Sequence, residues 1–216
     1  MVDPGQDSVD RLQEIIRDER LKPIAVVLTH GHVDHVWSVA PVAAGYGIPA
    51  YIHHADRFRL ADPVGTSVPG VADALRAMTK GALELTEPED IRELKDGERL
   101  DLAGMAWDVL HAPGHTEGSL VYRNAEDLKP GPVLLSGDVL FAGSIGRTDL
   151  PGGDSVAMTE TLRSVILTQS DDCLVLPGHG PGTSIAAERR SNPFLAGLEP
   201  GDRNAGRASN TQRRGL

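Results

Sequence analysis

Three histidines and one aspartate lie close together in the segment Thr29–His35, which follows a short apolar run. Such a run is typical of a buried strand, and in an extended chain residues two apart point to the same side. His30 and His32 can therefore converge on one ion, while a turn into a helix would direct Asp34 and His35 toward a second. Imidazole and carboxylate ligands suit Zn, Fe, Mn or Co, and without cysteine a thiolate-rich structural zinc site is excluded. The spacing predicts two adjacent metal sites, with a polar surface loop as the alternative.

Two more histidines, His115 and His179, each follow a Pro-Gly pair that comes after an apolar run. Glycine beside a histidine lets the backbone approach a ligand closely. A single histidine in a turn is more often solvated or structural, but the repeated pattern favours metal binding at both positions. Asp138 follows the strand-like residues 133–135, and taken alone it would be an ordinary turn aspartate.

The other histidines and the single cysteine have weaker signals. His53 and His54 end a predicted strand, and we expect them to be structural or to lie behind the metal ligands. His111 is expected to hydrogen-bond within its own loop. Cys173 is expected to be a small buried apolar residue.

Helices and strands alternate irregularly along the chain, with hairpins among them. Apolar spacing predicts helices over 7–21, from 34 onward with Pro41 bending or splitting it, over 71–80, and from an N-cap at Asp154. Strands are predicted over 24–28, 50–53, 99–110 as a hairpin turning at 103–104, 118–122, 133–135 and 173–176. This order predicts an α+β fold, a sheet sandwich flanked by helices, rather than a doubly wound parallel sheet.

The composition favours one soluble domain that acts on a small molecule. With 216 residues, 40% of them apolar, the chain can bury one sizeable core, and we expect a single domain over 1–198. Residues 199–216 carry almost nothing apolar and are expected to be a disordered tail. A net charge of -10 disfavours a nucleic-acid or anionic-membrane partner. A lone cysteine and the lack of a membrane-length apolar run indicate a cytoplasmic protein.

The ordered pattern of possible ligands resembles the five-motif signature of the metallo-β-lactamase superfamily over nearly the whole chain. Phrases at 112–116 (Ala-Pro-Gly-His-Thr), 146–150 (Gly-Arg-Thr-Asp-Leu) and 192–195 (Asn-Pro-Phe-Leu) resemble its compact glyoxalase II-like branch, the hydroxyacylglutathione hydrolase-like proteins. The resemblance implies an αββα sandwich. It also implies two divalent metal ions, with zinc expected and iron or manganese as alternatives.

The same resemblance implies a role for each residue of the pattern. Metal one would be held by His30, His32 and His115. Metal two would be held by Asp34, His35 and His179. Asp138 would bridge the two ions. Asp34 and Asp138 would be the catalytic carboxylates. Behind these ligands, Asp3 would support the histidine segment, and Arg147 and Asp149 would orient the bridge region unless they form an exposed ion pair.

The implied reaction is hydrolysis of a small-molecule thioester, a 2-hydroxyacyl-thiol ester, by a metal-bridging hydroxide. Two divalent ions lower the pKa of a shared water to about 7, so no protein nucleophile is required. The chain accordingly lacks a Gly-x-Ser-x-Gly elbow, a Walker-type loop and a dinucleotide fingerprint. Alternatives are a persulfide dioxygenase with a mononuclear iron site and a catalytically silent metal-binding protein. The thiol carrier and the oligomeric state stay open.

Two departures from the family pattern limit what carries over. Family members carry strands ahead of the position of Asp3, whereas this chain opens on the turn-like residues 1–5, so we expect the sandwich to lack its first N-terminal strands. An apolar edge and face would then be open, which favours self-association. Only 37 residues follow His179, so the C-terminal glutathione-binding extension of larger relatives does not carry over. Members that degrade antibiotics lack the full ligand pattern, which favours the glyoxalase type.

Overall fold

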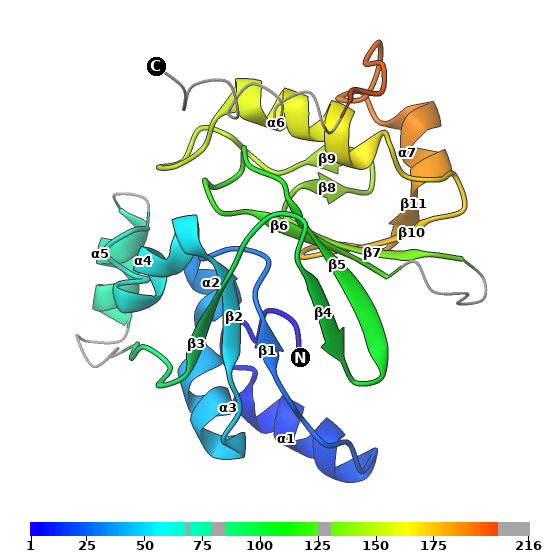
Figure 1. The fold of residues 1–216 in the computed structure, drawn as a ribbon. Coiled ribbons are helices and arrows are strands. Elements are labelled where there is room, and N and C mark those ends of the chain that lie inside the picture. Colours follow the sequence, from blue (N-terminus) through cyan, green and yellow to red (C-terminus); the bar gives the residue numbers. More distant parts are fainter. Residues whose placement is uncertain (68–69, 79–84, 125–130, 203–216) are drawn as a thin grey trace, which may run out of the picture.

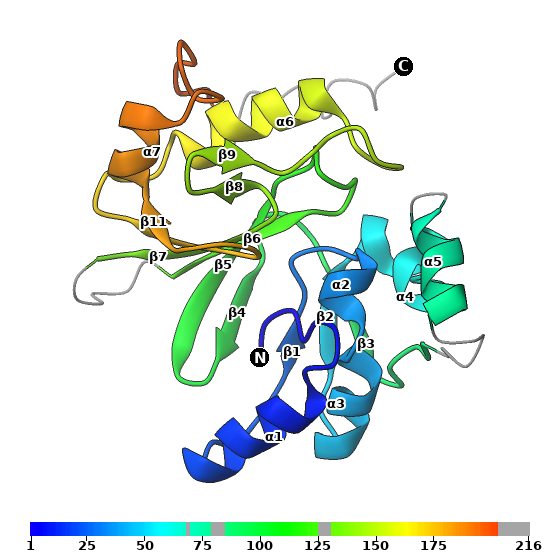
Figure 2. The same ribbon diagram turned by 180° about the vertical axis from the view of Figure 1, so that it is seen from behind.

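Two β-sheets face each other at the centre of the molecule, and helices cover the outer side of each (Figure 1). The computed structural model describes residues 1–67, 70–78, 85–124 and 131–202. Seen from behind, α1 to α5 lie with the sheet of β1 to β3, and α6 and α7 lie over the other sheet (Figure 2). The predicted α+β sandwich flanked by helices is therefore confirmed.

The first half of the chain forms a parallel three-stranded sheet in the order β1-β2-β3. Its strands are β1 (Val26–Val27), β2 (Ala50–His53) and β3 (Ile91–Leu94). Its helices are α1 (Val9–Asp18), α2 (Val33–Val36), α3 (Val39–Tyr46), the short 3-10 turn η1 (His54–Asp56), α4 (Arg57–Ala61) and α5 (Val71–Met78).

The second half forms a six-stranded sheet in the order β11-β10-β7-β6-β5-β4, antiparallel except where β7 pairs with β10. Its strands are β4 (Arg99–Leu102), β5 (Met105–His111), β6 (Leu120–Asn124), β7 (Val133–Gly137), β10 (Leu174–Pro177) and β11 (Thr183–Ser184). A small hairpin, β8 (Leu140–Phe141) and β9 (Ser144–Ile145), lies beside it. The helices are α6 (Ser155–Thr161), which continues as the π-helical turn η2 (Leu162–Ile166), and α7 (Ile185–Ser191).

The space between the two sheets is closed by apolar packing and by two hydrogen bonds. Leu120 and Tyr122 of β6 are buried there against Val27 of β1. The Tyr122 hydroxyl donates to the Leu28 carbonyl at 2.7 Å, and the Leu120 amide donates to the Thr29 carbonyl at 2.7 Å. A buried leucine side chain contributes about 1.5–3 kcal/mol, so this packing fixes the point at which the chain leaves β1.

Several predicted elements agree closely with the structure, and the helix predicted from residue 34 is two separate helices. The strand over 50–53 and the hairpin turning at 103–104 are present, and the Asp154 side chain accepts from two backbone amides at the start of α6. The predicted helix from residue 34 is split at Trp37 and Ser38, ahead of Pro41, which lies in the first turn of α3. Proline is tolerated there because the first amides of a helix have no intrahelical acceptor.

Other predicted boundaries differ by a few residues or extend beyond the described part. The first helix spans ten residues, and β1 is shorter than the predicted strand. Residues 79–80 of the predicted 71–80 helix lie outside the described residues. Of the predicted tail over 199–216, residues 203–216 also lie outside them.

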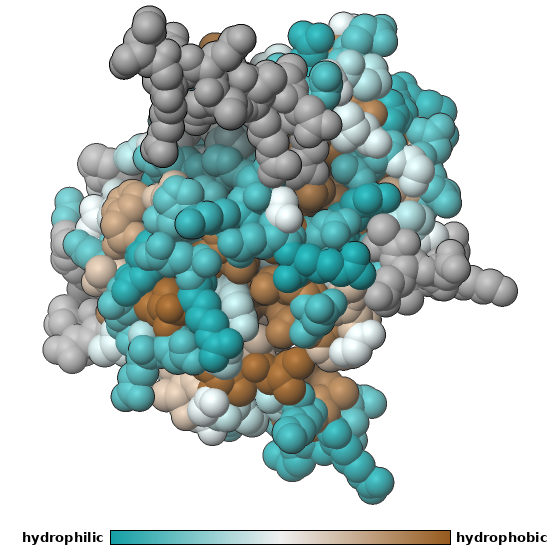
Figure 3. Space-filling model, in the orientation of Figure 1, coloured by the Kyte–Doolittle hydropathy of each residue, from teal (hydrophilic) through white to brown (hydrophobic). Residues whose placement is uncertain are grey.

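The sequence predicted no strand ahead of the turn signal at 3–5, but the first residues do pair with the first sheet. Val2 pairs with Val27 in a parallel bridge, and the Met1 ammonium donates to the Ala25 carbonyl at 2.8 Å. They thus extend the first sheet beyond β1. Beside them, an apolar groove of about 140 Å³ lies between the sheets, and Leu100 and Trp107 line its far side. Figure 3 shows apolar side chains gathered on this face of the molecule. In the described ranges, no helix has both the length and the apolar character needed to cross a membrane.

Candidate metal centre

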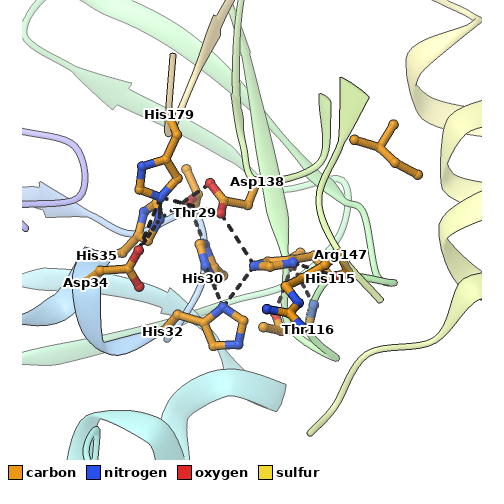
Figure 4. A network of polar contacts seen from close by, with 12 residues as sticks. Thr29, His30, His32, Asp34, His35, His115, Thr116, Asp138, Arg147 and His179 are labelled. Atoms are coloured by element: carbon orange, nitrogen blue, oxygen red, sulfur yellow. Dashed lines mark hydrogen bonds and ion pairs between the residues drawn. The ribbon is translucent and has the colours of Figure 1, made fainter. Parts of the chain in front are cut away.

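The segment Thr29–His35 leaves the end of β1 between the two sheets and carries four possible ligands (Figure 4). His32 is still extended, with φ -67° and ψ 147°, and α2 begins at the next residue. His30 and His32 therefore bring their rings together, while the helix directs Asp34 and His35 to a second position. The change from extended to helical backbone at one residue separates the two pairs.

The first cluster consists of His30, His32 and His115, whose ligand atoms all lie within 4.8 Å of one another. His32 Nδ1 lies 3.1 Å from His30 Nε2 and 2.8 Å from His115 Nε2. His30 and His115 are buried. Because His115 follows β5 in the second sheet, the cluster joins the two halves of the sandwich.

The second cluster consists of Asp34, His35 and His179, which also lie within 4.8 Å of one another. His179 Nε2 is 3.2 Å from His35 Nε2 and 3.1 Å from Asp34 Oδ2. The His35 side chain is 4% exposed, whereas those of Asp34 and His179 are 49% and 56% exposed. This cluster also joins the halves, since His179 follows β10, but it opens to solvent.

Asp138, in the turn after β7, lies between the two clusters. Its Oδ1 atom is 3.4 Å from His35 Nε2, and its Oδ2 atom is 3.6 Å from both His115 Nε2 and His179 Nε2. A Cβ atom on Gly178 would collide with Asp138 Oδ1, so the Pro-Gly-His turn before His179 requires its glycine. One carboxylate thus faces both groups of imidazoles.

The donor atoms of this arrangement fit metal ions. A neutral imidazole has one protonated nitrogen and one lone pair, so three nitrogens that converge on one point cannot all be satisfied by one another. Among the described residues, Asp138 Oδ1 is buried without a hydrogen-bond partner. Such an atom is costly unless a cation or a donor meets it. Nitrogen and carboxylate donors in these numbers suit Zn, Fe or Mn.

Asp3 lies behind both clusters and orients two of their rings. Its Oδ1 atom accepts from the Thr29 amide at 2.7 Å, and its Oδ2 atom lies 2.9 Å from His35 Nδ1. The Thr29 hydroxyl, which donates to Asp3 at 2.6 Å, is 3.1 Å from His30 Nδ1. Asp3 also groups with His30 and His35 within ligand distance, but its two oxygens already accept these hydrogen bonds. These contacts leave the Nε2 atoms of both histidines to face the clusters.

Arg147 contacts the site through its backbone rather than its side chain. Its carbonyl oxygen accepts from His115 Nδ1 at 2.8 Å, which leaves Nε2 of that ring to face the first cluster. The Arg147 guanidinium pairs with Asp149 at 2.8 Å, and both side chains are more than 60% exposed. The structure therefore places Asp149 in an exposed ion pair and away from the ligand cluster.

The two clusters differ in the protonation that their surroundings favour. Burial lowers the pKa of all three first-cluster imidazoles, and for His32 it falls to about 3. Burial acts in the same direction on His35, but contacts with Asp138 and Asp3 outweigh it and raise its pKa to about 10. The same imidazolium lowers the pKa of Asp138 against the opposing effect of burial. The first cluster is therefore neutral near pH 7, whereas His35 carries a proton when no ion is bound.

A pocket of about 230 Å³ opens over both clusters. His32 and His115 of the first cluster, Asp34 of the second, and Asp138 line its floor. One wall comes from Thr66 and Val71 around α5, and the other from Leu150, Pro151 and Arg147. The pocket is large enough for a small organic group and brings it directly over the converging ligand atoms.

The remaining histidines form a separate group at the ends of β2 and β5. The rings of His53 and His111 stack with centroids 4.1 Å apart, and His54 packs beside them. His111 Nε2 is 2.8 Å from the Glu117 carbonyl, a hydrogen bond within its own loop as predicted. Burial and the neighbouring histidines lower the pKa of His53 to about 3. These contacts are structural.

Sequence reasoning missed two residues that contact the ligand segments, Asp56 and Arg59. Both are buried, and Asp56 accepts from the Gly31 amide at 2.8 Å and from the Thr116 hydroxyl at 2.7 Å. Neither belongs to a recognisable spacing pattern. The one signal available was an acidic residue shortly after a predicted strand, close to a histidine pair.

Comparisons with known proteins agree with this geometry. A family model described as the metallo-β-lactamase superfamily matches residues 1–179. The hydroxyacylglutathione hydrolase GloC of Haemophilus influenzae is 34% identical over 196 residues, which cover 90% of this chain and 86% of that protein.

Two solved structures share the fold at higher identity. TTHA1623 in a di-iron-bound form superimposes with a TM-score of 0.73 at 36% identity, covering 90% of this chain and 88% of that one. The BLEG-1 B3 metallo-β-lactamase superimposes with a TM-score of 0.75, also at 36% identity, covering 91% and 88%. Sequence identity and TM-score therefore do not show which of these two proteins this chain resembles in activity.

Proposed function

The chain belongs to the metallo-β-lactamase superfamily, which indicates a metal-dependent hydrolase, and we propose that it is a binuclear thioester hydrolase. Metal one is held by the first cluster, His30, His32 and His115. Metal two is held by the second cluster, Asp34, His35 and His179. Asp138 is the bridging ligand, and Asp34 and Asp138 are the carboxylates that face the reacting group.

The observation that carries this proposal is the position of Asp138 between two complete clusters of three ligands. A single mononuclear site would use only one cluster. In the described part of the chain the buried Asp138 Oδ1 has no hydrogen bond of good geometry and lies 3.4 Å from His35 Nε2, so a cation would stabilise it. Three protein ligands with further positions open are typical of catalytic rather than structural metal sites.

Two observations support a thioester as the substrate. A relative at 34% identity carries the name hydroxyacylglutathione hydrolase. The pocket combines apolar walls at Val71, Leu150 and Pro151 with a polar floor, which suits a short acyl group whose carbonyl points downward. A departing thiolate needs little acid assistance, so no further proton donor is required of the pocket.

When bound, divalent ions at these positions lower the pKa of water and polarise a carbonyl oxygen. The chain's own residues prepare the site for them. Asp3 holds His35 by Nδ1, and the Arg147 carbonyl holds His115 by Nδ1, so the opposite ring nitrogens are directed inward. The pocket walls exclude bulk water from one side and orient the acyl group.

Zinc is the proposed ion, with iron or manganese as alternatives. The neighbour TTHA1623 was solved with two irons, which shows that this fold accepts that metal in that protein. The ligand set here has nitrogen and oxygen donors that suit all three ions. We further propose a cytoplasmic enzyme with a small-molecule substrate.

An anaerobic assay of the zinc-loaded protein tests the function. We expect hydrolysis of glutathione thioesters or other thiol esters without oxygen, because the reaction changes no oxidation state. A β-lactam belongs in the same panel, since BLEG-1 shares 36% identity. His32→Ala is the matched control, and it should lose metal and hydrolysis together.

Other outcomes would replace the proposal. Oxygen consumption on a persulfide by the iron form, without thioester cleavage by the zinc form, would identify a dioxygenase. Turnover of the β-lactam alone would identify a lactamase. A protein that binds two ions and turns over none of these substrates would be a silent metal-binding protein.

A further inference from the structure

Asp56, at the end of η1, is fully buried and accepts hydrogen bonds from three separate groups. Its Oδ2 atom accepts from the Gly31 amide at 2.8 Å and from the Thr116 hydroxyl at 2.7 Å. Its Oδ1 atom accepts from the Gly118 amide at 2.9 Å. A buried carboxylate is stable only when such donors meet it, and these three come from outside its own turn, whereas a fourth and longer contact comes from Arg59 within it.

The donors belong to the two segments that carry the first cluster. Gly31 lies between His30 and His32, and Thr116 directly follows His115. The first segment leaves β1 and the second follows β5, so they come from opposite sheets of the sandwich. One carboxylate therefore holds together the backbones from which all three imidazoles project.

Arg59 completes this arrangement. Its Nε atom is 3.4 Å from Asp56 Oδ1, and its Nη2 atom donates to Glu117 Oε2 at 2.6 Å and to the Pro151 carbonyl at 3.1 Å. The guanidinium offsets the buried negative charge, and its side chain is only 2% exposed. It also ties the pocket wall at Pro151 to the same turn.

The turn carrying Asp56 and Arg59 packs closely against both ligand segments, on the Asp56 backbone at Gly118 and on the Arg59 side chain at Gly31. A Cβ atom on Gly118 would lie 2.6 Å from the Asp56 amide nitrogen, and one on Gly31 would lie 2.7 Å from Arg59 Cβ. Real Cβ atoms do not approach so closely, so each segment meets the turn through a glycine. The backbones on which the ligands stand are thus seated directly on this turn.

We propose that Asp56 is a positioning residue for the first metal site, setting the distance between the pair His30 and His32 and the ring of His115. The proposal rests on the ligand assignment made above. The hydrogen bonds of Asp56 run to residues beside His30, His32 and His115 of the first cluster. Asp3 and Asp138, by contrast, contact both clusters, since each also lies beside His35. Loss of the Asp56 carboxylate therefore weakens the first site selectively.

Zinc titration of metal-free protein against a competing chelator tests this selectivity without an activity assay. Asp56→Asn is measured in two backgrounds, His179→Ala, which leaves the first cluster complete, and His32→Ala, which leaves the second. The substituted side chain places an amide donor against groups that are themselves donors, so we expect zinc to bind about 10–100-fold more weakly in the first background. In the His32→Ala background the change in zinc affinity should stay under about threefold, which is less than the loss typical when a hydrogen bond to a metal ligand is removed.

Glu188→Gln is the matched control. Glu188 is also buried and its carboxylate accepts from the Gly143 amide, the Thr183 hydroxyl and the Asn192 side chain, none of which is adjacent to a ligand. Both variants should lower the temperature of thermal unfolding, but only Asp56→Asn should weaken zinc binding at the first cluster. Equal losses of zinc affinity in both backgrounds would make Asp56 merely structural and overturn the proposal.

A second pair of variants covers the case in which Asp56→Asn does not fold. Thr116→Val removes the hydroxyl that donates to Asp56 at nearly constant volume, and Thr116→Ser keeps it. Weaker zinc binding in the valine variant with recovery in the serine variant supports the proposal, and equal affinities refute it. If wild type and His32→Ala instead bind zinc equally, the ligand assignment fails, and the failure lies with the proposed function.

Discussion

The two clusters at the centre of the molecule use similar donor groups in opposite settings. The first is buried and consists of imidazoles whose pKa values burial has lowered. The second opens to solvent through Asp34 and His179, and its one buried ring, His35, has a raised pKa. Neutral imidazole is the form that binds metal, so the first cluster is ready to accept an ion and the second must first release a proton. If the clusters bind metal as proposed, burial and charge rather than ligand type should set the order in which they fill.

The largest effect is expected at Asp138, the residue that the two clusters share. Asp138→Asn removes a negative charge that faces His35, His115 and His179 at once. We expect hydrolysis to fall more than about a hundredfold, beyond the usual cost of a lost outer contact, with both zinc equivalents weakened. Steady-state kinetics and metal analysis check this. Wild-type behaviour would show that another residue bridges the ions.

A smaller effect is expected on zinc content when one ligand of either cluster is removed. After desalting, His179→Ala should keep about one zinc per chain in the first cluster, whereas His32→Ala should keep less than about one, because its remaining cluster is open to solvent. Elemental analysis of both variants purified in parallel gives the comparison. Equal metal contents in the two variants would contradict the proposed order of filling.

The pH dependence of binding should differ between the two zinc equivalents. The pKa of His35 is raised to about 10, so zinc must displace a proton there, and affinity for the second equivalent should rise about tenfold per pH unit from pH 6 to 8. The pKa of His32 is about 3, so these imidazoles are already neutral and the first equivalent should change little. Calorimetry in buffers of different ionisation enthalpy measures the released proton. Proton release with the first equivalent instead would reverse the comparison.

The smallest effect is expected outside both clusters. Asp149→Asn breaks an exposed ion pair with Arg147 but leaves the Arg147 carbonyl on His115. Solvent screens an ion pair this exposed, so zinc content and turnover should stay within about twofold of wild type. A loss comparable to that of Asp138→Asn would place Asp149 among the residues that orient the site.

The residues of the two clusters could be picked out from the sequence because much of their spacing is local. Alternation in an extended segment, followed by a helix start, is enough to separate His30 and His32 from Asp34 and His35. The Pro-Gly-His turns were recognisable because they repeat. None of this depends on tertiary contacts, and the structure brings all of these residues together.

Elements defined by their partners could not be predicted in the same way. The strand β3, with sequence Ile-Arg-Glu-Leu, has two charged residues at its centre and was not predicted, and it forms where β2 offers a parallel edge. Asp56 gains its role only when Gly31 and Thr116 arrive from two sheets. The helix from residue 34 was expected to bend or split near Pro41, but the exact break at Ser38, whose amide donates to the Pro4 carbonyl, depends on a distant contact.

Both clusters join residues that are far apart along the chain. His32 and His115 are separated by 83 residues, and His35 and His179 by 144. An ion shared by such residues closes a loop in the polymer, and the entropy of closure grows only with the logarithm of loop length, by about 0.5 kcal/mol between these two. An unfolded chain would have to close both loops before it could hold both ions. Ions bound as proposed would therefore favour the folded chain, and its unfolding temperature should rise with the concentration of free ion.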